Sequence, residues 1–219
     1  MQSLALYKSL NFDPSITRTR STNSDQWQFL IAYQYPDLGT VDAAANMPLA
    51  PTRWTGWDES GVERDVHELV EFAFFTYPER QIFRPSWSTV SSTDNLGKSL
   101  IMVGLESPAG DEELDEWYKK QHLDMLSMIP GYRMSSRYQL QKPQGLVKHL
   151  LETGGLKEPF ELPPRWLALH QYEQVGQPDP EWVKKVVSTE WSKKILDGAR
   201  YERGVWEYVK EFEQTNGGI

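Results

Sequence analysis

A histidine and a tyrosine one helical turn apart are the residues best placed by type and spacing to do chemistry. They are Tyr118 and His122, within DEWYKKQHLDMLSMIPGYRMSSRYQL at residues 115–140. Residues four apart on a helix project from the same side. An imidazole titrates near neutrality and passes protons in either direction, and a phenol can donate to a carbonyl oxygen. The spacing therefore offers His122 as a general acid/base, although a hydrogen-bonded core histidine is the commoner role.

Other motifs that would carry chemistry are missing from the sequence. The four histidines, at positions 67, 122, 149 and 170, form no HxH, HExxH or histidine–carboxylate spacing, so we expect no metal site. There is no GxSxG, P-loop or GxGxxG pattern. The absence of cysteine excludes disulfides, thiolate metal sites and a cysteine nucleophile. We expect His67 to be structural and His149 to be solvated.

Composition and charge narrow the class of partner. The 219 residues carry a net charge of −8 without a concentrated basic cluster, so nucleic acid is not an expected partner. No apolar run is long enough to span a bilayer and no secretion signal is present, so we expect a cytoplasmic protein that binds no membrane. The 9 Trp and 10 Tyr residues suggest an aromatic-lined cavity for a small molecule, or else a core filled by large side chains.

The pattern of apolar residues predicts an α+β fold of the ferredoxin-like type, with the element order β-α-β-β-α-β. Strands are expected at 98–106, 132–140, 165–173 and 204–212, and helices at 111–127 and 178–196. Pro130 and Gly131 end the first helix. The residues at 141–164 are rich in glycine and proline and predict a loop, with room for a short helix around 146–152.

A weak internal repeat relates the first half of the chain to this unit. The segment FLIAYQY at 29–35 lies 137 positions before WLALHQY at 166–172. The same shift superimposes Trp54 on Trp191, Gly61 on Gly198 and Phe75 on Phe212. Two copies of one unit are the economical explanation.

The first copy matches only the later half of the second. It would hold strands at 27–35 and about 66–76 with a weak helix between them. Its first strand and helix are either degenerate, in SLALYKSLNF and SITRTRST, or missing. We therefore expect a degenerate ferredoxin-like repeat at 1–97 and a ferredoxin-like domain at 98–219.

Helices cover one face of such a sheet, and the other face must be buried, which two sheets achieve by closing into a barrel within one chain or between two. Alternation divides strand 166–172 into an aliphatic face and an aromatic, polar face. We expect the aliphatic face to pack on the helices and the aromatic face to line the barrel. The residues expected there are Trp166, Ala168, His170 and Tyr172, Phe29, Ile31, Tyr33 and Tyr35 in the first copy, and Tyr132, Met134, Ser136 and Tyr138 on strand 132–140.

Residues 98–212 resemble the EthD family of dimeric α+β barrels. The residues that carry the resemblance are Trp117-Tyr118, His122, Pro130-Gly131 and Arg137-Tyr138-Gln139-Leu140, which follow the family's W-Y-x-x-x-H, P-G and R-Y-x-L pattern. RWLALHQYE and RGVWEYV are similar to its next and last strands. The family often has glutamate directly before the histidine, whereas this chain has Gln121, so a carboxylate that would tune His122 is missing.

The resemblance implies an enzyme without a cofactor that acts on a polyketide-like or aromatic substrate in secondary metabolism. The reaction would be a decarboxylation, dehydration or cyclisation, that is, the work of a lyase or cyclase. A cofactor-free oxygenase of an anthrone or quinol, and a barrel that binds a ligand without chemistry, are the alternatives. Haem use, as in distant relatives, is a minor further alternative, in which His122 or His170 of this chain would be the axial ligand.

The expected site brings together residues from both halves of the chain. Catalysis is assigned to His122, Tyr118 and Tyr138, which would move protons or donate to substrate oxygens. Substrate binding is assigned to Trp117, Arg137, Trp166, His170, Tyr172, Trp206 and Tyr33. No metal or cofactor is expected. The expected partner is a small-molecule substrate, and a homodimer would be compatible with the barrel.

Overall fold

The computed structural model describes residues 3–10, 29–34, 55–57, 63–65, 79–88, 97–140 and 163–213. The chain divides into two compact units. The first contains Met1–Gln34, Tyr77–Leu140 and Leu162–Ile219, and the second contains Tyr35–Thr76 and Gln141–Glu161. His67, His149, the strand predicted at about 66–76 and the helix predicted around 146–152 lie outside the described residues.

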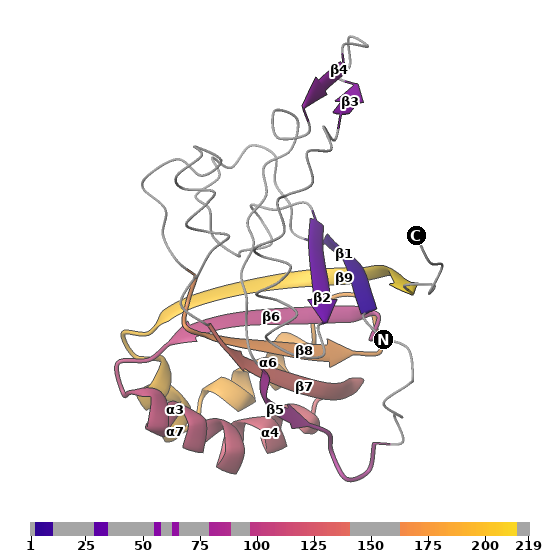
Figure 1. Ribbon diagram of the computed structural model, residues 1–219. Coiled ribbons are helices and arrows are strands. Elements are labelled where there is room, and N and C mark those ends of the chain that lie inside the picture. The colour runs from indigo at the N-terminus through magenta and orange to yellow at the C-terminus, as the bar shows by residue number, and fades with distance from the viewer. Residues whose placement is uncertain are drawn as a thin grey trace. The chain divides into compact units, whose positions relative to one another are not determined.

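A βαββαβ unit forms the centre of the large sheet, as the sequence predicts (Figure 1). Its elements are β6 (Ser99–Glu106), α3 (Asp111–Trp117), the π-helical turn η1 (Tyr118–His122), α4 (Leu123–Ser127), β7 (Tyr132–Gln139), β8 (Trp166–Tyr172), α6 (Pro180–Val187), α7 (Glu190–Leu196) and β9 (Arg200–Glu213). The strands lie in the order β9-β6-β8-β7, and neighbouring strands are antiparallel. The fold is therefore α+β and ferredoxin-like.

Three strands from the first half of the chain extend this sheet at both edges. β1 (Ser3–Ser9) pairs with β9, β2 (Phe29–Gln34) pairs with β1, and β5 (Glu79–Phe83) pairs with β7. The result is a seven-stranded sheet in the order β2-β1-β9-β6-β8-β7-β5. The strand predicted at 27–35 is confirmed as β2. That the first half is a second copy of the unit stays a prediction.

In the second unit, β3 (Thr55–Trp57) and β4 (Glu63–Asp65) pair as a short antiparallel hairpin. A weak helix was the expectation between residues 35 and 66, and for these two segments it is wrong. Threonine and tryptophan favour strands, and Gly56 between them disfavours a helix.

The helical segment at 111–127 begins and ends where the sequence predicts. Asp111, Glu112 and Glu113 occupy its first turn, where the helix dipole favours negative charge. Gly131 follows it with a φ of 79°, a conformation that glycine adopts without the strain a Cβ would bring. The chain can therefore turn sharply from α4 into β7.

The second helical segment consists of two helices, not the single helix predicted at 178–196. α6 ends at Val187 and α7 begins at Glu190. Thr189 has an extended backbone, and its hydroxyl accepts the backbone N–H of Ser192. Threonine at this position caps the new helix, which is why the segment breaks here.

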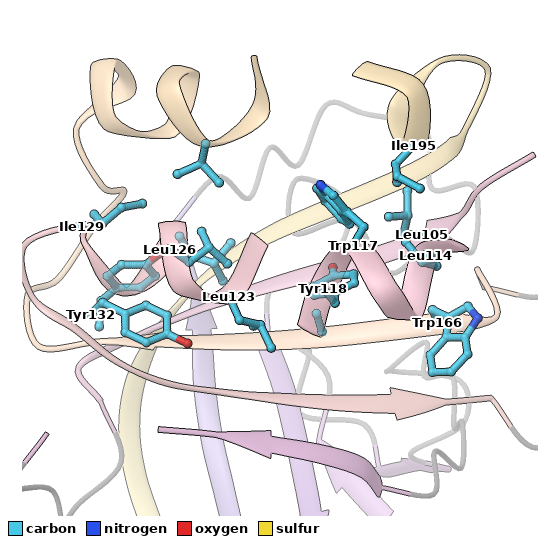
Figure 2. Close-up of a cluster of buried hydrophobic side chains, with 14 residues drawn as sticks. Leu105, Leu114, Trp117, Tyr118, Leu123, Leu126, Ile129, Tyr132, Trp166 and Ile195 are labelled. Carbon is cyan, nitrogen blue, oxygen red and sulfur yellow. The ribbon is translucent and has the colours of Figure 1, made fainter. Parts of the chain in front are cut away.

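The helices pack on one face of the sheet and bury the main core with it (Figures 1 and 2). Figure 2 shows Trp117, Leu123 and Ile195 in the layer between helices and strands. Nε1 of Trp117 donates to Oγ of Ser192 at 3.2 Å and thereby ties α3 to α7. This core comprises Ile101, Leu105, Leu114, Trp117, Tyr118, Leu123, Leu126, Ile129, Tyr132, Trp166, Ala168, Tyr172, Val186 and Ile195.

The aromatic face of β8 points toward the helices, so the predicted facing of this strand is wrong. Trp166 and Tyr172 belong to the helix-side core, whereas Leu167 and Leu169 pack with the apolar cluster on the other face. Nε1 of Trp166 donates to Oδ1 of Asp111 on α3 at 2.8 Å. Alternation separates the two faces of a strand, but it does not say which one the helices cover.

Leu123→Ala should lower the free energy of unfolding by about 2–5 kcal/mol, because it leaves a cavity in a packed core. Leu123 is 0% exposed. Met128→Ala is the control, since Met128 is 67% exposed and its truncation should change stability by no more than about 0.5 kcal/mol. Urea denaturation of the two variants measures the difference, and equal effects would contradict the packing of α4 on the sheet.

Candidate active site

His122 lies between the helices and the sheet, on the π-helical turn η1. It is 7% exposed, and its ring stacks on Trp117 with centroids 3.9 Å apart and planes at 25°. Its Nδ1 atom has no hydrogen-bond partner among the described residues. Buried polar atoms without partners are rare in folded proteins. This atom is therefore a candidate for contact with a bound molecule.

The π-helical turn gives the candidate site its local geometry. Tyr118 and His122 meet edge to face, with ring centroids 5.1 Å apart and planes at 87°. Turns of this type often occur at functional sites, because the extra residue re-aims side chains without ending the helix. Gln121, which stands where the family often has glutamate, accepts a hydrogen bond from the Thr189 hydroxyl at 2.8 Å. Its side-chain oxygen is thus used in a contact with Thr189, the residue that caps α7.

A buried arginine lies beside the tyrosine. The Arg137 side chain is 2% exposed, and its Nη1 donates to Oδ1 of Asp115 and to Oε1 of Gln81, both at 2.8 Å. Its guanidinium carbon lies 4.0 Å from the centroid of the Tyr118 ring and 5.2 Å from that of Trp166, which makes cation–π contacts. Its Nη2 has no hydrogen-bond partner in the part of the chain that the structure describes.

The arginine belongs to a small charge cluster. Nζ of Lys119 lies 2.5 Å from Oδ2 of Asp115, so two cations share one carboxylate. Burial raises the pKa of Asp115, but the hydrogen bonds from Lys119 and Arg137 outweigh it and hold that pKa below its usual value. Asp115 is therefore ionised at neutral pH, and the three groups together carry an excess of positive charge.

A second histidine lies at the end of a buried hydrogen-bonded chain. Nδ1 of His170 is 2.6 Å from Oγ of Ser135, which is 2.5 Å from the hydroxyl of Tyr132. Pairing of β7 with β8 places Ser135 directly opposite His170. The His170 ring is 4% exposed, and its centroid is 6.4 Å from that of His122. The two imidazoles are therefore neighbours.

Burial and nearby positive charge keep both imidazoles neutral at physiological pH. Burial, His170 and Arg137 together lower the pKa of His122 well below its usual value. Burial, with Arg137 and Arg203, lowers the pKa of His170 to about 3. Burial raises the pKa of Tyr118, so its phenol keeps its proton. The cluster thus contains neutral bases, a phenol donor and a permanent cation.

The structure gathers most, but not all, of the predicted site residues. Those on the helix side of the sheet are Trp117, Tyr118, His122, Arg137, Trp166, His170 and Tyr172. Tyr138 follows Arg137 on β7, so it points to the opposite face. Trp206 packs on that opposite face as well. Tyr33 lies on β2, four strands from β8, and its side chain is outside the described residues.

Sequence reasoning missed three residues that complete the cluster, which are Asp115, Gln81 and Ser135, and it gave Tyr132 no role beyond lining the barrel. The spacing of Asp115 and Lys119 signals a helical ion pair. Gln81 meets Arg137 through the pairing of β5 with β7, for which the sequence gives no signal. Tyr132 was predicted to share a face with Tyr138, but an irregularity between Tyr132 and Met134 turns it to the helix side.

Within the described ranges, no group of three or more His, Cys, Asp or Glu side chains is arranged to hold a metal ion. In the same part of the chain, no helix has both the length and the apolar character needed to cross a bilayer.

The lowered pKa values predict that stability falls with pH below about 6.5, the ordinary value of a histidine. In this window the unfolded chain binds protons at His122 and His170, whereas the folded protein does not until the pH approaches about 3 for His170. The free energy of unfolding should then drop by about 1.4 kcal/mol per pH unit for each histidine. Urea denaturation of the wild type and of His170→Gln at a series of pH values measures it. In His170→Gln, the free energy of unfolding should fall less steeply with decreasing pH, by the amount that one histidine contributes. A slope equal to that of the wild type would contradict the lowered pKa of His170.

Comparison with known proteins gives one structural neighbour. No protein-family model matches the chain, and no curated protein matches it. Among solved structures, the chain is similar to one described as "Crystal structure study of anthrone oxidase-like protein", with a TM-score of 0.49 and 10% sequence identity. The match covers 100% of this chain and 82% of that chain. A similarity of this size establishes neither a shared family nor a shared activity.

Proposed function

We propose that this protein is a cofactor-independent enzyme that removes a proton beside a carbonyl group of an aromatic or polyketide-like small molecule. In this proposal His122 is the base, and Arg137 holds the oxygen on which negative charge develops. The observation that carries the proposal is that a neutral base and a permanent cation, both buried, each present a nitrogen without a partner among the described residues.

The charges of the cluster suit this chemistry. Proton transfer to His122 alone would place a second positive charge near Arg137, which the lowered pKa of His122 shows to be unfavourable. When the proton comes from a carbon next to a carbonyl, an enolate forms at the same time and offsets the new charge. A fixed guanidinium then stabilises the enolate oxygen without reorganising. The base is therefore effective only toward a substrate that becomes negative.

The surrounding side chains suit a flat, moderately apolar substrate. Trp117 stacks on His122, and Trp166 lies beside Arg137. Aromatic rings of this kind bind planar molecules and exclude water, which strengthens electrostatic interactions inside the site. Tyr118 keeps its proton and is suited to donate to a substrate oxygen. Tyr138, Trp206 and Tyr33 are not part of the proposed site.

Proton removal beside a carbonyl begins or accompanies each of the reactions that the resemblance to the EthD family implies, which are decarboxylation, dehydration and cyclisation. We assign the protein to this group of lyases and cyclases. Removal of a phenolic or anthrone proton would instead prepare a substrate for oxygen, as in a cofactor-free oxygenase.

The near-complete burial of His122 is the observation that favours the third candidate, a barrel that binds its ligand without chemistry.

His122→Gln should lower turnover by at least about 100-fold, because general base catalysis contributes that much or more. The assay incubates the protein in deuterium oxide with aromatic β-keto acids, β-hydroxy ketones and anthrones. Deuterium entering the carbon beside the carbonyl reports proton removal whatever the final product is. Release of carbon dioxide, loss of water and uptake of oxygen then separate the reaction types.

Arg137→Lys tests the role proposed for Arg137. Lysine keeps the positive charge but lacks the planar guanidinium and its second terminal nitrogen, Nη2. We expect a loss of about 100-fold in turnover. Arg165→Lys is the matched control, because Arg165 is a half-exposed residue paired with Asp111. Full activity of His122→Gln would overturn the proposal. Quenching of tryptophan fluorescence by aromatic ligands without any deuterium exchange would identify a binding protein.

A further inference from the structure

The chain Tyr132–Ser135–His170 is fully buried, and the proposed base does not require it. Its three groups come from β7 and β8 and are joined by contacts of 2.5 and 2.6 Å. Among the described residues, Ser135 is the hydrogen-bond partner of the Tyr132 hydroxyl. The direction in which the hydrogens point along this chain decides which nitrogen of His170 carries its proton.

Only one direction satisfies all three groups. If Nδ1–H of His170 donated to Ser135 and Ser135 donated to Tyr132, the phenol hydrogen would be buried with no acceptor in the described part of the chain. Such a hydrogen is unfavourable, because it has lost its hydrogen bond to water and gained no other. In the reverse direction, Tyr132 donates to Ser135, and the single hydroxyl proton of Ser135 goes to Nδ1 of His170. Nδ1 is then an acceptor, and the proton of the neutral imidazole is on Nε2.

The hydrogen-bonded chain from Tyr132 through Ser135 to His170 is not suited to conduct protons. If His170 gave its proton to a substrate and was refilled through Ser135, Tyr132 would become a buried phenolate. Burial raises the pKa of Tyr132 and opposes that state. If His170 instead accepted a proton, it would become a cation near Arg137 and Arg203, both of which disfavour it. The hydrogen bonds therefore hold the imidazole in one neutral form.

We infer that His170 works as a fixed, neutral hydrogen-bond donor through Nε2–H, and that Ser135 and Tyr132 are positioning residues that set its tautomer. This inference rests on the proposed function and adds to it a second donor for the substrate oxygen. Nε2 lies on the edge of the ring away from Nδ1, and the ring neighbours His122. The ligand class is a molecule whose carbonyl oxygen becomes negative, held by two donors that do not change protonation, Arg137 and His170.

Nitrogen NMR of the wild-type protein tests the tautomer without any substrate. In long-range ¹H–¹⁵N spectra at neutral pH, Nδ1 of His170 should resonate as an unprotonated nitrogen and Nε2 as a protonated one. His170→Gln identifies the signals by deleting them. In Ser135→Ala, Nδ1 loses its hydrogen bond, so its resonance should shift toward that of a free imidazole. A protonated Nδ1, a cationic ring, or an unchanged spectrum in Ser135→Ala would overturn the inference.

The deuterium-exchange assay then tests the role in catalysis. Glutamine can place an amide N–H near the position of Nε2–H but cannot carry a proton between groups. We expect His170→Gln to stay within about tenfold of the wild type, whereas His170→Ala should lose about 100-fold, the usual effect of removing one such donor. Equal inactivity of the two variants would show that His170 must change protonation, which would overturn the inference.

The failure of this inference is distinguishable from the failure of the proposed function. If the wild type exchanges no deuterium with any substrate, or if His122→Gln remains fully active, the proposed function fails whatever His170 does. If His122→Gln is inactive and both His170 variants are equally inactive, only the donor role of His170 fails.

Discussion

The buried guanidinium of Arg137 is the constraint around which this side of the fold is arranged. An arginine cannot lose its charge in a protein, so a folded chain that buries it must bring partners to it. Those partners come from four elements: Asp115 on α3, Gln81 on β5, Tyr118 on η1 and Trp166 on β8. The edge strand and the first helix are thus fixed to the centre of the sheet by one charge as well as by the apolar core.

Burial and the same charge together decide the protonation state of the two histidines. Burial is the main reason that the pKa values of both imidazoles are lowered, and the positive charge of Arg137 adds to it, so both stay neutral. In the proposed function, neutrality makes His122 available as a base and leaves His170 able to donate. In the proposed function, a site that is positive before a ligand arrives selects molecules that can become negative within it.

The sequence predicts the architecture of residues 98–213 well, because apolar period, turn residues and helix-start acids are local signals. His122 and Tyr118 could be proposed from their spacing alone. The facing of β8 could not, since Trp166 and Tyr172 would suit either a barrel interior or a helix-covered core. Nor could the meeting of Gln81 with Arg137 or of Ser135 with His170, because both depend on strand pairings between segments far apart in the chain. Threonine is a residue type that caps helices, but the apolar pattern on both sides of Thr189 predicts one continuous helix.

The pairing of β1 with β9 has a consequence for how the chain is made. Ser3 lies opposite Glu213, so the first described strand is held by the last. During synthesis β1 and β2 can pair only with each other, as a hairpin that is at best marginally stable in water, until β9 has left the ribosome. Closing so long a loop is slow. The edge of β1 therefore stays unpaired until β9 has been made, and this is the stage at which chaperones would matter most to the yield.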